Sequence, residues 1–221
     1  MINQEIQLTE KDRIILDSYK EMVVGLGSYL GKGYEIILHS LESFDHSIIQ
    51  IINGHYSGRS KGSPITDFAL SMLNNIKEHG DKSSVTYFNR NKKNEILKST
   101  TIPLLGENKR IIGLLCINFY TSISISDFVS QLYPQSHMQL AEAKNIETFS
   151  ENIDDLLEST LNEIRENIMN DPSISSANKN KEIIIALEQR GIFNIKDSVV
   201  KIANLLNISK NTVYLHLRNL K

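Results

Sequence analysis

The segment RIIGLLCINFY (residues 110–120) is apolar at both sets of alternating positions. Successive side chains of a strand point to opposite faces. The two sets here are Ile111, Leu115, Ile117 and Phe119 on one face, and Ile112, Leu114 and Cys116 on the other. A strand that is apolar on both faces is covered on both faces. We therefore expect a sheet between two layers, one formed by the domain's own helices and the other by an N-terminal helix or a partner subunit.

Four more stretches have the composition of strands. They are rich in β-branched residues or alternate apolar and polar residues with period two. They lie at residues 34–41, 46–54, 83–90 and 94–104. Helical spacing occurs over residues 11–30, where Ile15, Tyr19, Met22, Leu26 and Leu30 recur every three or four positions. A second helix is predicted after Thr66, a favourable N-cap, and ends near Gly80.

The order of these elements is two strands, a helix and three strands, which is the order of a PAS-type sensor domain. We therefore predict an α+β fold in which residues 1–121 form a PAS-like antiparallel sheet of five strands with helices.

Residues 122–177 are predicted to be an acidic linker with a helix at about 151–169. Residues 126–170 hold 2 Lys+Arg and 9 Asp+Glu. The apolar positions of the helix step by 4, 4, 3 and 4, and they are Ile153, Leu157, Leu161, Ile164 and Ile168. This seam either packs on its own domain or forms a contact between two copies of the chain.

Residues 178–221 are predicted to form an all-α helix-turn-helix domain. Three helices are expected at 178–191, 196–207 and 209–220. Ala203 is small enough to let the last two helices approach, and Asn207 stands where the turn needs a left-handed residue. Helix-turn-helix geometry places the start of the last helix in the major groove of double-stranded DNA.

The predicted DNA-binding residues lie on or next to this last helix. They are Ser209, Lys210, Asn211, Thr212, Tyr214, His216 and Arg218. Asn211 can bond an adenine edge, whereas Lys210 is expected to contact phosphate. The whole chain has a formal net charge of −2, but residues 171–221 hold 8 Lys+Arg and 4 Asp+Glu. Local charge governs attraction to phosphate. The alternative is a sensory or protein-interaction module without direct DNA binding.

Four segments of the chain resemble the YheO/DauR-like transcriptional regulators. They are INGHYSGRSKGSPITDFAL (52–70), EIILHSL, IIGLLCINF and EQRGIFNIKDSVVKIANLLNISKNTVYLHL. The likeness covers nearly the whole chain except residues 121–150. The resemblance implies a bacterial DNA-binding regulator with a YheO-like PAS domain, which senses a small molecule, and a DauR-like helix-turn-helix.

The loop between the second strand and the second helix is the predicted ligand-binding site. Its polar candidates are Asn53, His55, Ser57, Arg59 and Thr66. Arg59 could clamp the carboxylate of a small polar effector. The alternative is that these residues only cap the helix and hold the loop in place.

No enzymatic activity, metal site or cofactor is predicted. Cys116 stands in an apolar strand, where a cysteine is usually inert, and the six histidines lack the spacing of metal ligands. A single cysteine, a polar N-terminus and the absence of a long apolar run predict a cytoplasmic protein without a membrane segment. A homodimer is expected because one small helix-turn-helix contacts few bases.

Overall fold

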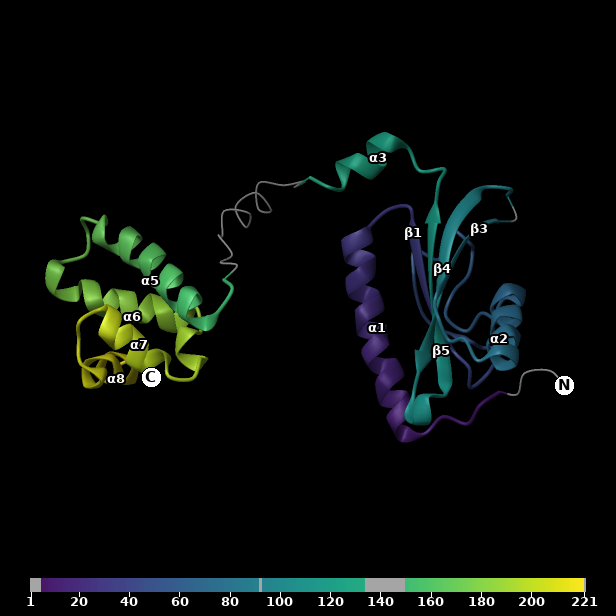
Figure 1. The fold of residues 1–221 in the computed structure, drawn as a ribbon. Coiled ribbons are helices and arrows are strands. Elements are labelled where there is room, and N and C mark those ends of the chain that lie inside the picture. The colour runs from purple at the N-terminus through teal and green to yellow at the C-terminus, as the bar shows by residue number, and fades with distance from the viewer. Residues whose placement is uncertain (1–4, 92, 134–149, 221) are drawn as a thin grey trace. The chain divides into compact units, whose positions relative to one another are not determined.

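A computed structural model describes residues 5–91, 93–133 and 150–220. The chain forms two compact units, Met1–Gln139 and Leu140–Lys221 (Figure 1). The predicted linker at 122–177 includes residues 134–149, which lie outside the described residues.

The first unit is built on an antiparallel sheet of five strands, in the order β2-β1-β5-β4-β3. The strands are β1 (Tyr34–Ser40), β2 (Ile48–Ile52), β3 (Val85–Arg90), β4 (Ile96–Leu105) and β5 (Ile111–Tyr120). The two-sided strand, β5, lies at the centre, between β1 and β4. The α+β fold class and the five-stranded antiparallel sheet are confirmed.

Helix α1 (Glu10–Leu30) covers one face of the sheet, over β1 and β2. The Thr9 hydroxyl caps it by accepting a hydrogen bond from the backbone N–H of Asp12 at 3.2 Å. The helix buries Leu16, Val23 and Gly27. A β-carbon on Gly27 would stand 2.6 Å from the Ile52 side chain, so glycine lets the helix approach the sheet closely.

Helix α2 (Asp67–His79) lies on the opposite face (Figure 1). Thr66 is its N-cap and accepts from the Ala69 N–H at 3.2 Å, and Gly80 ends it in the left-handed conformation, as predicted. A bulge between Leu104 and Leu105 shifts the register against β5. As a result Ile111 packs on the α2 side and Ile112 on the α1 side, the reverse of strict alternation.

The short turn Glu107–Lys109 joins β4 to β5, and the short helix α3 (Ile125–Ser130) follows β5. Gln131, next to α3, accepts from the Lys32 N–H at 2.7 Å and donates to the Lys32 carbonyl at 3.2 Å. These two bonds fix the position of α3 beside the C-terminal end of α1.

Over residues 150–220, the second unit contains helices and no strand. They are α5 (Ile153–Met169), α6 (Lys179–Gln189), α7 (Ser198–Leu205) and α8 (Lys210–Arg218), with short turns at Ser176–Asn178 and Ile192–Asn194. Leu157, Leu161 and Ile164 of α5 are buried in a core shared with the other three helices. The apolar seam of α5 therefore packs within its own unit. None of the helices in the described ranges has the length and apolarity that crossing a bilayer requires.

Candidate nucleic-acid interface and ligand site

The turn between α7 and α8 has the geometry that the sequence predicts. Asn207 adopts the left-handed conformation, with φ of 54°. The Ile208 N–H donates to the carbonyl of buried Ala203 at 3.0 Å, which closes the turn across the point where the two helices meet. This bond and the left-handed residue together set the angle between α7 and α8.

Helix α8 begins at a well-formed cap. The Ser209 hydroxyl accepts from the Thr212 N–H at 3.0 Å and lies 2.8 Å from the Thr212 hydroxyl. Val213, one turn into the helix, is fully buried and anchors α8 to its unit. Ser209 and Thr212 are therefore already engaged in the structure of the helix start.

One stripe of α8 is open to solvent. Lys210, Asn211, Tyr214 and Arg218 are exposed, whereas Thr212 and His216 are half-buried. A depression of about 490 Å³ lies along this stripe, lined by Asn211, Thr212, Tyr214, Leu215 and Arg218. The structure thus brings most of the predicted DNA-binding residues onto one accessible face.

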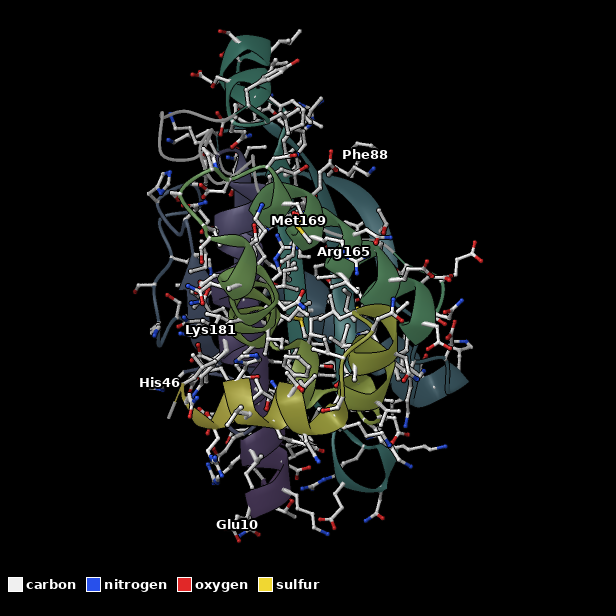
Figure 2. All side chains as sticks on the ribbon, turned by 90° about the vertical axis from the view of Figure 1, so that its left-hand side faces the viewer. Glu10, His46, Phe88, Arg165, Met169 and Lys181 are labelled. Atoms are coloured by element: carbon white, nitrogen blue, oxygen red, sulfur yellow. The ribbon has the colours of Figure 1, made fainter. Side chains whose placement is uncertain are left out.

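The net charge of the second unit is lower than that of residues 171–221 alone. The reason is that the acidic helix α5 packs onto this basic segment. Residues 150–221 together hold 9 Lys+Arg and 10 Asp+Glu. Arg190 donates two hydrogen bonds of 2.7 Å to Glu163 of α5, and Lys201 pairs with Asp154. Arg165 of α5, which Figure 2 labels, donates to the Leu205 carbonyl at 3.0 Å.

Two basic residues of α8 remain available on its outer side. Within the described part of the chain, Lys210 and Arg218 form no ion pair. Helix α8 carries these two positive charges and no acidic residue, so it can attract phosphate although the unit as a whole is close to neutral.

A layer of polar side chains lies inside the first unit, on the α2 side of the sheet. Glu35 of β1 is buried and accepts hydrogen bonds from the Ser57 hydroxyl, from Asn118 Nδ2 at 3.0 Å and from the Tyr120 hydroxyl at 3.5 Å. Ser99 of β4 donates to Asn118 Oδ1 at 2.8 Å. These bonds satisfy polar groups that would be costly to bury without partners.

Arg59 adds a positive charge to this layer. It is half-buried, and it donates to the Pro64 carbonyl. Burial lowers the pKa of Arg59, and the negative charge of Glu35 opposes that shift. Burial, followed by the charge of Arg59, lowers the pKa of His39 to about 3, so His39 is neutral at ordinary pH. Its Nδ1 lies 2.8 Å from the Ser47 hydroxyl.

Two of the five predicted ligand residues belong to the polar layer, and the other three do not. Ser57 and Arg59 interact with Glu35, in the polar layer. Asn53 adopts a left-handed conformation and donates to the Tyr34 carbonyl at 2.8 Å, while Thr66 caps α2. His55 is exposed and packs against Tyr56, with ring centroids 4.3 Å apart.

Sequence reasoning missed the members of the polar layer that come from strands. They are Glu35, His39, Ser99, Asn118 and Tyr120. The available signal was a charged residue, Glu35, which shares one face of β1 with Ile37 and His39. A charge in a strand covered on both faces needs buried partners, and those partners mark a polar site.

Cys116 borders the same layer. Although the residue as a whole is only partly buried, desolvation of its thiol raises the pKa to about 11. Thr101 Oγ1 lies 3.5 Å from its sulfur. A thiol with a raised pKa is a poor nucleophile at neutral pH. Among the described residues, no cluster of histidine, cysteine and carboxylate side chains could hold a metal ion.

Comparison with known proteins places the chain in a family. Residues 9–134 match the YheO-like PAS domain, and residues 156–218 match an HTH domain. A Haemophilus influenzae protein is 38% identical over 220 residues, which span 100% of this chain and 97% of that protein. Protein YheO of Escherichia coli K12 is 39% identical over 212 residues, or 96% of this chain and 87% of its own length.

The transcriptional regulator DauR of Pseudomonas aeruginosa is 24% identical over 210 residues, which span 93% of this chain and 94% of DauR. The match to the PAS domain covers more than half of the chain, and the relatives align along nearly their full length. The chain therefore belongs to the YheO-like family, with a YheO-like PAS domain followed by an HTH domain.

Proposed function

We propose that the protein is a DNA-binding transcriptional regulator and that α8 reads the major groove. The observation that carries this proposal is the exposed stripe of Lys210, Asn211, Tyr214 and Arg218 on a helix whose start is capped and whose entry turn is fixed. The HTH match and the name of DauR support it. A regulator of this kind acts on chromosomal DNA, which in a bacterium lies in the cytoplasm.

The roles on α8 follow from side-chain chemistry. Asn211 and Tyr214 face the base edges, and Lys210 and Arg218 neutralise phosphates. Ser209 and Thr212 hold the helix start, where backbone N–H groups can also face a phosphate. His216, half-buried, lies at the margin of the contact.

Salt dependence of DNA binding distinguishes this function from a sensory or interaction module that does not bind DNA. Fluorescence anisotropy of a labelled duplex with the full chain should give an affinity that falls as salt rises, because phosphate contacts release counterions. Lys210→Ala should reduce the slope of log affinity against log salt by about 1.

Lys181 provides the matched control for this experiment. It is an exposed lysine on α6, outside the α8 stripe (Figure 2). Lys181→Ala should leave the slope unchanged. No binding to the duplex at any salt concentration would favour the alternative function.

We also propose that the polar layer around Glu35 and Arg59 senses a small polar effector with a carboxylate group. Arg59 is half-buried, and its guanidinium donates a hydrogen bond to a neutral group, the Pro64 carbonyl. A carboxylate would be a stronger hydrogen-bond acceptor for this guanidinium. Ser57 and Asn118, which both donate hydrogen bonds to Glu35, are the hydroxyl and amide groups of the polar layer that would orient such a ligand.

Native mass spectrometry of the full chain purified from its own host tests this site. The wild type should retain a small molecule, and Arg59→Ala should lose it while its thermal melt stays cooperative. Arg13→Ala is the control, because Arg13 is exposed and pairs with Glu42. An adduct that survives Arg59→Ala in a folded protein would refute the assignment, and an unfolded variant would indicate a structural arginine.

Two copies of the chain are proposed to act together. A single small HTH domain contacts few base pairs, and paired half-sites supply the missing affinity. The α5 seam is buried within its own unit, so the contact between copies needs another surface.

A further inference from the structure

One apolar side chain of α8 lies on the outer side of the helix, among the residues that are proposed to read DNA. Leu215 is 46% exposed, whereas Val213 and Leu217 of the same helix pack in or against the core of the second unit. A single exposed leucine is common on protein surfaces. What calls for an explanation is therefore the place of Leu215 within the α8 stripe.

Leu215 shares one face of α8 with polar residues of the stripe. Residues that follow one another at intervals of three and four lie along a single face of an α-helix. Asn211, Tyr214, Leu215 and Arg218 have this spacing, and all four line the depression of about 490 Å³. The leucine therefore lies one turn after an amide and one turn before a guanidinium, on a face that would be wholly polar if it met only water.

The charge around Leu215 favours a polyanionic partner. Arg218 lines the same depression, and Lys210 lies at the start of the same helix. Helix α8 contains no acidic residue. An apolar group between two cations suits a partner that is negatively charged along its backbone and carries apolar groups between its charges, and duplex DNA is such a partner.

Leu205 of α7 gives the contrasting case. It is 37% exposed and lines a hollow of about 260 Å³. That hollow is bordered by Asp154 and Glu158, and its lysine, Lys201, is already paired with Asp154. Negative charge there repels phosphate, so of these two leucines Leu215 is the one that is placed to meet DNA.

Thymine is the base that offers an apolar group to such a side chain. Its C5 methyl group projects into the major groove, where apolar side chains contact it, whereas the other groups that bases present there are hydrogen-bond donors and acceptors. A leucine placed against a donor or acceptor would leave that polar group without a partner, which is costly. Contact with a methyl group carries no such cost.

We propose that Leu215 recognises the C5 methyl group of a thymine close to the base that Asn211 reads. Four residues along a helix span about 6 Å. Bases of one strand are spaced about 3.4 Å along the duplex, so the thymine lies within about two base pairs of the base that Asn211 bonds. This inference rests on the proposed DNA-reading role of α8, to which it adds recognition of an apolar group.

Replacement of thymine by uracil tests this contact, because uracil lacks the C5 methyl group and keeps the hydrogen-bonding groups of thymine. Fluorescence anisotropy of the full chain is measured on a duplex that the protein selects from random sequences, with its thymines replaced one at a time. The wild type should lose affinity about fourfold at one thymine, which is the value of one buried methyl group. Leu215→Ala should bind the thymine and uracil duplexes alike at that position. Leu215→Met, which keeps an apolar side chain of similar size, should retain the preference.

Leu205→Ala is the matched control, since it removes another exposed leucine of the same unit, and it should respond to uracil as the wild type does. Circular dichroism checks that each variant folds. A wild type that binds equally at every uracil substitution would overturn the role of Leu215, and so would a folded Leu215→Ala variant that remains as sensitive as the wild type. In either case, loss of sequence preference in Asn211→Ala would show that α8 still reads DNA. A chain that selects no duplex from random sequences would instead refute the DNA-reading role, and the contact of Leu215 with it.

Discussion

Asp12, in the first turn of α1, is fully buried and pairs with Arg110 at the start of β5. Its carboxylate also accepts from the Glu107 N–H at 2.8 Å and from the Thr9 N–H at 3.0 Å. The pair joins the N-terminal helix to the turn between β4 and β5, which follows it by more than ninety residues. Burial disfavours the charged form, but these hydrogen bonds outweigh burial and hold the pKa of Asp12 well below its usual range.

Acid should therefore destabilise the first unit through Asp12. Because the pKa is lower in the folded state, the carboxylate stabilises the fold above its unfolded pKa of about 4, and this contribution is lost as pH falls below that value. Asp12→Asn should lower the free energy of unfolding by about 1–3 kcal/mol at neutral pH and flatten its dependence on acidic pH.

Tyrosine fluorescence during urea unfolding measures this effect, since seven of the eight tyrosines precede residue 134. Asp17→Asn is the control, because Asp17 is an exposed residue of the same helix and pairs with nearby Lys20. Equal pH profiles for Asp12→Asn and the wild type would contradict the role of the buried pair.

His39 should remain neutral well below the pH at which an ordinary histidine gains a proton. Burial and the charge of Arg59 lower its pKa to about 3. The neutral ring therefore stabilises the fold above the unfolded pKa of about 6.5, and that contribution declines as pH falls from there towards 3. Nitrogen chemical shifts of the ring should show no titration between pH 8 and 5, and Arg59→Ala should raise the pKa. Titration of His39 near pH 6.5 in the folded protein would rule out this environment.

Asn207 should tolerate glycine and resist alanine. Its φ of 54° costs a residue with a β-carbon about 1–2 kcal/mol, which asparagine partly avoids and glycine does not incur. Asn207→Ala should lower the melting temperature of the second unit, while Asn207→Gly should preserve it. Asn204→Ala, an exposed position inside α7, is the control and should be neutral or slightly stabilising. Calorimetry of the full chain can follow this transition, and equal melting of the alanine and glycine variants would exclude strain at the turn.

Local sequence signals predicted the elements of this fold and the geometry of its HTH turn. Thr66 and Ser209 were identifiable as helix caps because a cap depends on residues within one turn. Asn207 was identifiable because few residues tolerate its conformation.

Features that depend on distant residues could not be predicted in this way. The Glu35 site requires Asn118, which lies 83 residues further along the chain. Of the predicted stripe of α1, Ile15, Tyr19, Leu26 and Leu30 pack against the core of the first unit, but Met22 is exposed. The centre of the buried stripe runs through Leu16, Val23 and Gly27, and the glycine was not identifiable because it has no apolar side chain to count. The neutral charge of the second unit depends on α5 packing against it, which the periodicity of α5 left open.

The proposed DNA-reading role of α8 is tested most directly by comparing two neighbouring variants on a duplex selected from random sequences and on an unrelated duplex. Asn211→Ala should reduce the preference for the selected duplex by about 5- to 150-fold, because it removes a bond to a base edge, and should leave nonspecific affinity unchanged. Lys210→Ala should weaken binding to both duplexes alike, because it removes a phosphate contact. Footprints and preferences that are identical in both variants and in the wild type would contradict the account.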